Sequence, residues 1–168
     1  MIPRFLLAVT TALLLTACAK DAVKPETAAE AEADTAAVEL HFHAIAGLNP
    51  GANGQAAPVR VRIFELKNIA SFARADYFAL VERTQSTLGA DLLDQDELLL
   101  QPGEQLTVER GPHSAARHIG LAVGFREIDQ AQWRAVLTVA PHQASDFHIA
   151  VDARAISGVP AANPNRHH

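Results

Sequence analysis

The sequence predicts an all-β protein, namely an antiparallel β-sandwich with a small helical element inserted between strands. Apolar and polar residues alternate with a period of two through most of residues 38–156. Turn residues recur at short intervals, and strands and helices do not alternate as they would in a parallel-sheet fold. The segment has 119 residues, which is enough for one compact domain and too few for two.

Six segments of this domain have strand patterns. Nearly continuous apolar runs at 119–125 and 135–139 are typical of central strands that are covered on both faces. Strict alternation predicts half-buried strands in the segments that include Val38, Val59, Leu106 and Phe147.

A tight turn and a helical insert complete the domain. Residues 98–100 read as a strand, and Pro102 with Gly103 predicts a hairpin turn into the next strand, because Pro presets the first corner and Gly accepts a positive φ. After Asn68 and Asp76, both suitable N-caps, apolar residues recur at helical spacing. Two short helices are therefore expected between the second and third strands.

The N-terminus carries the features of an export signal. Arg4 is followed by an apolar stretch at 5–15, which is shorter than the roughly 20 residues of a membrane-spanning helix. The stretch ends in Leu-Thr-Ala-Cys at 15–18, which resembles the bacterial lipobox. We therefore expect residues 1–17 to be removed and Cys18, the single Cys of the chain, to be acylated. The alternative is an ordinary signal peptide with an unrelated Cys nearby.

The segments on either side of the domain have compositions that cannot build a core. Residues 18–37 contain the predicted lipidated Cys18 followed by Ala, Glu, Asp, Lys and Thr, which predicts a flexible spacer. Residues 157–168 contain Pro and Gly without apolar periodicity and are expected to form a flexible tail. By resemblance to sorted lipoproteins of Gram-negative bacteria, Ala19 implies transport to the outer membrane, with the body of the protein facing the periplasm.

Charge and motifs exclude several classes of function. There are 14 Lys and Arg against 19 Asp and Glu, a net charge of −5, which argues against binding to nucleic acid. No nucleophile elbow or phosphate-binding loop occurs, so we expect no catalytic residues and no cofactor. The carboxylates of Asp91, Asp94, Asp96 and Glu97 read as the solvated side of a connecting segment and not as an acid–base pair.

A metal or small-ligand site is the main alternative. Glu39, His41 and His43 would share one face of the first strand, where three donors could converge. The same face lies opposite Phe42 and would be polar in any half-buried strand, and spacing ties no fourth ligand to it. A lipid-anchored hydrolase is a third class, for which the sequence offers no nucleophile.

The connection between the first two strands is the candidate binding site. Residues 47–57 contain three Gly and one Pro, and they exceed the two to five residues of an ordinary hairpin loop. Long loops on rigid sandwiches commonly carry binding surfaces, although an inert loop would have the same composition.

Several short motifs lie in order along residues 38–156 and together point to one family. They are Leu48-Asn49, VRVRIFEL at 59–66, Phe72, ADYF at 75–78, LGAD at 88–91, LQPG at 100–103, Gly120 with Phe125-Arg126, and QWR at 132–134. With the lipobox, they resemble the outer-membrane lipoproteins of the type VI secretion system, the TssJ (SciN, VasD) family.

This resemblance implies a transthyretin-like β-sandwich that acts as a scaffold and not as an enzyme. Its lipid anchor would hold it in the outer membrane, and its body would bind the periplasmic C-terminal region of the inner-membrane protein TssM. TssL would be reached only indirectly, through the membrane complex. In this family the first loop is implicated in partner contact, and the matching residues are Gly47, Leu48, Asn49, Pro50, Gly51, Ala52, Asn53, Gly54 and Gln55.

The loop departs from a typical binding surface in one respect. Leu48 is its only sizeable apolar residue, whereas strong interfaces usually contain an aromatic or Arg anchor. We expect neighbouring surface to share the contact. Trp133, Phe125 and Phe72 are expected in the core, and Arg126 or Arg134 to pair with Asp91 or Asp76 beside the helical insert.

Overall fold

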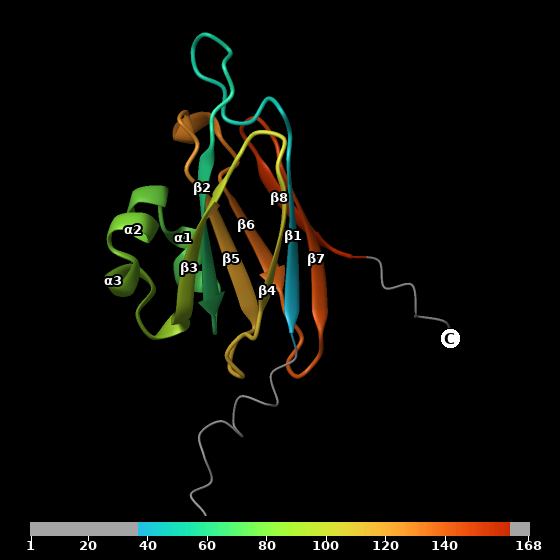
Figure 1. The fold of residues 1–168 in the computed structure, drawn as a ribbon. Coiled ribbons are helices and arrows are strands. Elements are labelled where there is room, and N and C mark those ends of the chain that lie inside the picture. Colours follow the sequence, from blue (N-terminus) through green and yellow to red (C-terminus); the bar gives the residue numbers. More distant parts are fainter. Residues whose placement is uncertain (1–36, 162–168) are drawn as a thin grey trace, which may run out of the picture.

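The computed structural model describes residues 37–161, which fold into two four-stranded β-sheets packed face to face (Figure 1). Sheet A has the strand order β4-β1-β7-β8, and sheet B has the order β3-β2-β5-β6. The strands are β1 (Val38–Ala44), β2 (Val59–Leu66), β3 (Leu92–Leu100), β4 (Gln105–Arg110), β5 (His118–Val123), β6 (Arg134–Thr138), β7 (Ser145–Val151) and β8 (Ile156–Pro160). The predicted β-sandwich is confirmed.

Most neighbouring strands are antiparallel, as the sequence predicts, but β1 and β7 pair in parallel. The chain crosses repeatedly between the sheets, so β1 and β2, which follow one another in the sequence, lie in different sheets. As a result β1 is a central strand of sheet A, flanked by β4 on one side and β7 on the other.

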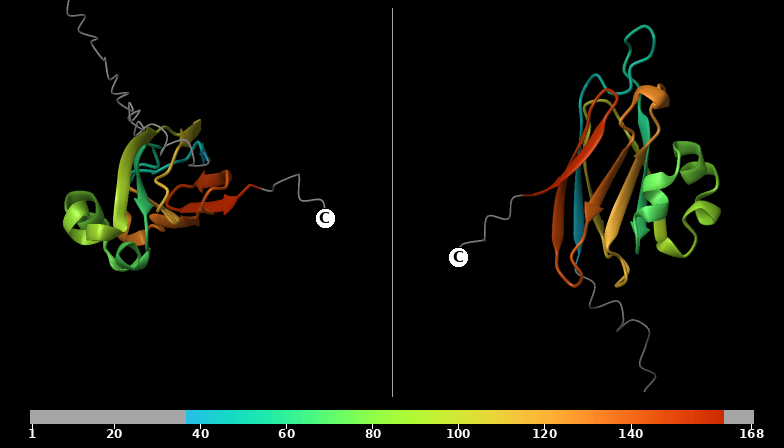
Figure 2. Two further views of the ribbon diagram at one scale, coloured as in Figure 1. Left: turned by 90° about the horizontal axis from the view of Figure 1, so that it is seen from below. Right: turned by 180° about the vertical axis from the view of Figure 1, so that it is seen from behind.

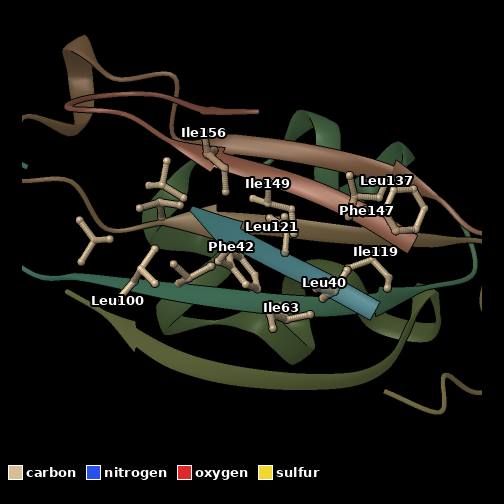
Figure 3. Close-up of a cluster of buried hydrophobic side chains, with 14 of the residues drawn as sticks. Leu40, Phe42, Ile63, Leu100, Ile119, Leu121, Leu137, Phe147, Ile149 and Ile156 are labelled. Carbon is tan, nitrogen blue, oxygen red and sulfur yellow. The ribbon is translucent and has the colours of Figure 1, made fainter. Parts of the chain in front are cut away.

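The core lies between the sheets and is made by the alternating apolar positions. Leu40 and Phe42 of β1 meet Ile63 of β2 and Leu121 of β5 in one continuous cluster, with Ile149 of β7 beside them (Figure 3). Each of these side chains is at most 1% exposed. Burial of one large apolar side chain contributes about 1.5–3 kcal/mol, so the alternation in the sequence is the main source of stability.

Helices cover the outer face of sheet B (Figure 2). They are α1 (Ala70–Arg74), α2 (Tyr77–Glu82) and α3 (Thr84–Leu88), followed by a 3-10 turn, η2 (Gly89–Asp91). Phe72 and Leu80 of the helices pack against Phe64 of β2 in a second buried cluster. Gly120 of β5 makes room for this layer, because a Cβ there would lie 2.9 Å from the ring of Phe72.

The helical insert confirms part of the prediction and corrects another part. Asp76 is an N-cap, since its carboxylate accepts a hydrogen bond of 2.8 Å from the backbone N–H of Ala79. The sequence predicts two helices, whereas the structure has three. The third, α3, was missed because it consists of TQSTL, which has only one large apolar residue.

Three further predictions from the sequence are wrong: the start of one strand, the type of one turn and the end of the domain. The acidic segment 91–97 is not a connection, because β3 already begins at Leu92. The turn at Pro102 and Gly103 joins β3 of sheet B to β4 of sheet A, so it is an arch between the sheets and not a hairpin. Strand β8 ends at Pro160, so the domain continues past Ile156 into the predicted tail.

The segment 135–139 was predicted to be a central strand, but β6 lies at the edge of sheet B. The predicted signal peptide, Cys18 and nearly all of the spacer lie outside the described residues. Within residues 37–161, no helix is long and apolar enough to cross a membrane.

Candidate functional site

The loop between β1 and β2 projects from one end of the sandwich (Figures 1 and 2). It begins after Ala44 in sheet A and ends before Val59 in sheet B. Part of its length is therefore needed to cross from one sheet to the other. The remainder extends beyond the ends of the strands.

The base of the loop is fixed by Leu48 and Asn49. Leu48 is fully buried in the main core cluster, and its carbonyl accepts a hydrogen bond of 2.9 Å from the N–H of Ala57, which closes the loop. Asn49 is 4% exposed. These two residues of the predicted contact surface therefore support the loop from beneath.

Asn49 joins three segments. Its Nδ2 donates to the carbonyl of Pro58 at 3.0 Å, and its Oδ1 accepts from the backbone N–H of Arg126 at 2.9 Å. Its own backbone N–H donates to the carbonyl of Ala153. The backbone at Asn49 has a φ of +49°, a left-handed conformation that Asn adopts more readily than most residues.

The tip of the loop is a small turn with its own hydrogen bonds. Gly51 donates its N–H to the carbonyl of Gln55 at 3.0 Å, and Gly54 donates to the carbonyl of Gly51 at 2.8 Å. The side-chain oxygen of Asn53 accepts from the N–H of Gln55 at 3.1 Å. These bonds fold residues 51–55 into a defined shape.

The exposed part of the loop suits recognition of another protein better than chemistry. Residues 52–55 are exposed and Gly47 also faces solvent, whereas Pro50 and Gly51 are half-buried. The loop has no charged side chain and no nucleophile, and it offers backbone groups and the amides of Asn53 and Gln55.

Arg126, which was expected beside the helical insert, lies beside the loop instead. A Cβ added at Gly51 would lie 2.6 Å from its Nη1. The next residue, Glu127, pairs with Arg154 at 2.7 Å. The expectation that Arg126 pairs with Asp91 or Asp76 is therefore wrong, because the residue lies against Gly51 and Asn49.

The predicted pairing of the insert is also different. Nη1 of Arg134 donates to backbone carbonyls at the end of α1, at 3.2 Å from Phe72, 2.7 Å from Ala73 and 3.0 Å from Ala75. Asp91 accepts a hydrogen bond of 3.0 Å from the hydroxyl of Ser71. The insert is thus held by Arg134, but through carbonyl groups and not through a carboxylate.

Glu39 and His41 of the metal alternative lie side by side, but His43 does not complete a metal site with them in the described residues. Nε2 of His41 lies 2.8 Å from Asp146 and 3.4 Å from Glu39, and Nδ1 lies 3.0 Å from the hydroxyl of Thr107. The ring of His148 lies beside both histidines, with its centroid 5.4 Å from that of His41 and 6.0 Å from that of His43. Among residues 37–161, no three His, Cys, Asp or Glu side chains are arranged to hold a metal ion.

The acidic residues of β3 are held by ion pairs. Asp94 and Asp96 each lie 2.9 Å from the guanidinium of Arg110, which also pairs with the buried Glu65 at 3.1 Å. Glu97 pairs with Arg60 and Arg62. The N–H of Glu97, and secondarily Arg110, hold the pKa of Asp96 below its ordinary value of 3.8, so this carboxylate is unsuited to act as a general acid near neutral pH.

Comparisons with known proteins agree with this architecture. A family model described as type VI secretion lipoprotein, VasD, EvfM, TssJ matches residues 36–154. The lipoprotein TssJ1 from Pseudomonas aeruginosa is 45% identical, with a TM-score of 0.75, and the match covers 77% of this chain and 99% of that one.

Two further solved structures contain similar chains. A chain in a structure described as a type VI membrane complex is 32% identical with a TM-score of 0.66, and a chain in a structure described as the TssM C-terminal domain (869–1107) from EAEC is 32% identical with a TM-score of 0.62. Both matches cover 74% of this chain and 98% of the other. No curated protein sequence matches.

Proposed function

The chain belongs to the TssJ family of type VI secretion lipoproteins, and from this premise we propose that it joins two membranes by binding TssM. In this proposal Cys18 is acylated and holds the protein in the outer membrane, as Ala19 implies. The sandwich then binds the periplasmic C-terminal region of TssM, and TssL is reached through the same complex. The protein acts as a scaffold without catalytic activity.

The main observation in favour of TssM as the partner is that a chain similar to this one is present in a structure described as the TssM C-terminal domain. The match covers 98% of that chain with 74% of this one, so that chain is roughly half as long as the fragment 869–1107. We infer from this length that it is a separate chain beside the TssM fragment. The 32% identity over nearly its whole length supports the same partner for this protein.

The loop between β1 and β2 is the docking point we propose. Its base is rigid, because Leu48 is buried and Asn49 is bonded on both sides. A defined loop loses less conformational entropy on binding than a flexible one. Contact would be made by the exposed tip, residues 52–55, together with neighbouring surface.

The position of the loop fits a bridging role. Strand β1 begins at Val38, just after the predicted spacer, and ends at Ala44, just before the loop. Spacer and loop therefore attach at opposite ends of one seven-residue strand, about 20 Å apart at roughly 3.3 Å per residue. A partner bound at the loop would not compete with the membrane surface for the same end of the domain.

A binding experiment with a shortened loop tests the proposal. Because Gly51 and Gln55 are already hydrogen-bonded, deletion of residues 52–54 should leave the ends of the loop in place. We expect the detergent-solubilised full chain to bind the periplasmic C-terminal region of TssM and the deletion variant to bind far more weakly.

The matched control is deletion of residues 141–143 in the turn between β6 and β7, at the other end of the sandwich. This control should bind as the wild type does. Failure of the wild type to bind TssM would overturn the scaffold proposal. Full binding by the 52–54 deletion would remove only the loop from it.

A further inference from the structure

Arg126 stands beside the docking loop in a fixed position. Its backbone N–H is bonded to Oδ1 of the buried Asn49, and its guanidinium lies against Gly51, which has no side chain to cover it. The residue as a whole is exposed. The loop and Arg126 therefore present one continuous surface, although they are 77 residues apart in the sequence.

The charge of this guanidinium is not neutralised within the described part of the chain. The loop itself has no charged residue, and the nearby Arg154 is already paired with Glu127 at 2.7 Å. Most other arginines of the domain are engaged: Arg60, Arg62 and Arg110 with carboxylates, and Arg117 and Arg134 with backbone carbonyls.

Unpaired cations do occur elsewhere in residues 37–161, at Lys67, Arg74 and Arg83, all exposed near the helical insert. A missing partner is therefore not distinctive by itself. What distinguishes Arg126 is that its backbone is fixed by the residue that also fixes the loop.

We propose that Arg126 binds a carboxylate of the partner and supplies the anchor that the loop lacks. The proposal rests on the proposed function, since it concerns the same docking surface. A guanidinium presents a planar fork of donors that matches a carboxylate with two parallel hydrogen bonds. Arg is also enriched among the residues that dominate interface affinity. The guanidinium occupies the space that a side chain at Gly51 would take, so the glycine allows Arg126 to lie directly against the loop.

Three substitutions at Arg126 test the proposal by their effect on affinity for the periplasmic C-terminal region of TssM. Arg126→Gln removes the charge and should weaken binding on the order of tenfold. Arg126→Glu should weaken it further through repulsion. Arg126→Lys keeps the charge but loses the fork, and should fall between wild type and Arg126→Gln. The full chain in detergent is used throughout.

Arg74→Glu is the matched control, because it makes the same change in net charge on α1, beside sheet B and away from the loop. It should bind as the wild type does. The affinity of Arg126→Gln should also depend less on salt concentration than that of the wild type, because one charge pair is missing. Thermal unfolding checks that each variant remains folded, which is expected because the Arg126 side chain makes no bond within the domain.

The outcomes separate this inference from the proposed function. If wild type and Arg126→Glu bind TssM equally well, the proposed role of Arg126 is wrong, whereas the proposal that the protein binds TssM is supported. If Arg74→Glu weakens binding as much as Arg126→Glu, net charge and not this guanidinium is responsible, which also overturns the anchor. If the wild type does not bind TssM, both are overturned.

Discussion

Asn49 shows how one side chain can fix the conformation of a long loop. It combines a left-handed backbone, almost complete burial and side-chain hydrogen bonds to Pro58 and Arg126. An apolar replacement would remove the partners of the Pro58 carbonyl and the Arg126 N–H, both of which are partly buried. The burial of Leu48 and the hydrogen bonds of Asn49 give the Leu48-Asn49 motif a role in supporting the loop.

Substitution of Asn49 by Ala should destabilise the domain by about 2–3 kcal/mol, through the lost hydrogen bonds and the unfavourable positive φ. Urea denaturation measures this free energy of unfolding. Asn53→Ala is the control, because Asn53 is exposed at the tip of the same loop, and it should change stability little. Equal effects of the two substitutions would contradict the supporting role of Asn49.

Asp96 makes stability depend on pH in the acid range. Its pKa in the folded protein is lowered below 3.8 by the N–H of Glu97 and by Arg110. A lowered pKa means that its contribution is complete above 3.8 and is lost as the pH falls through the folded-state pKa. Because Asp96 is largely exposed, solvent screens its ion pair and the contribution is small.

Comparison of wild type with Asp96→Asn tests this effect by urea denaturation over a series of pH values. The difference in unfolding free energy should be largest near neutral pH and should shrink as the pH falls below 3.8. Gln95→Ala, at the adjacent non-ionisable position, should show a difference that does not vary with pH. A constant difference for Asp96→Asn would contradict the assigned pKa shift.

At the scale of elements, the helical insert depends on Arg134. This side chain donates to three carbonyls at the end of α1 and stacks on Trp133, with its guanidinium carbon 4.6 Å from the ring centroid. Because Arg134 is the first residue of β6, it ties the helices to the opposite edge of sheet B. The insert is thus fastened at two places, by the apolar cluster around Phe72 and by this guanidinium.

Arg134→Met keeps the apolar stem but removes the donors. We expect a loss of about 1.5–3 kcal/mol, as is typical of hydrogen bonds from a charged group. Faster hydrogen exchange should be confined to residues 70–88, while the strands stay protected. Arg83→Met, on the same insert but without a described partner, should leave exchange unchanged. Unchanged exchange in Arg134→Met would show that the apolar cluster alone holds the helices.

Most strands could be predicted from sequence: alternation indicated those with one buried face, and a continuous apolar run indicated β5, which is buried on both faces. β1, β4, β7 and the first half of β2 alternate because only one face is in the core. Only the end of β3, residues 98–100, was predicted. The rest of β3 was missed because it is an edge strand whose carboxylates pair with Arg110 on one side and with Arg60 and Arg62 on the other. Alternation cannot reveal a strand whose polar groups on both faces have partners from other strands.

The sequence indicated where the candidate loop lies, but not which of its residues are exposed or which other segment lies beside it. The loop was found because it interrupts two strongly alternating strands. That Leu48 and Asn49 are buried, and that Arg126 lies beside Gly51, depends on the crossing of the chain between two sheets. Local sequence contains no information on which segments such a crossing brings together.

For the molecule as a whole, the proposed role requires anchoring at Cys18 and sorting by Ala19. Cys18→Ser should release the protein from the membrane fraction into the periplasm while leaving the domain folded, because each lost acyl chain removes about 0.8 kcal/mol per buried methylene. Ala19→Asp should keep the lipid anchor but retain the protein in the inner membrane.

Membrane fractionation on a density gradient measures both effects, and binding of TssM to the released Cys18→Ser protein checks its fold. If Cys18→Ser stays with the membranes, the protein is attached by something other than acylation at this position. If Ala19→Asp still reaches the outer membrane, the sorting rule does not apply to this chain.

The central position of β1 has a mechanical consequence. A link between two membranes carries tension. In the proposed bridge this tension would enter at Val38 and leave through the loop after Ala44, along the axis of β1. Its neighbours β4 and β7 pair with it through residues 38–43 and 38–44, with hydrogen bonds that run across the strand direction. A pull along β1 therefore shears both hydrogen-bond ladders at once and does not open them one bond at a time. The domain should resist force best in this direction, which is the direction of the load in the proposed membrane bridge.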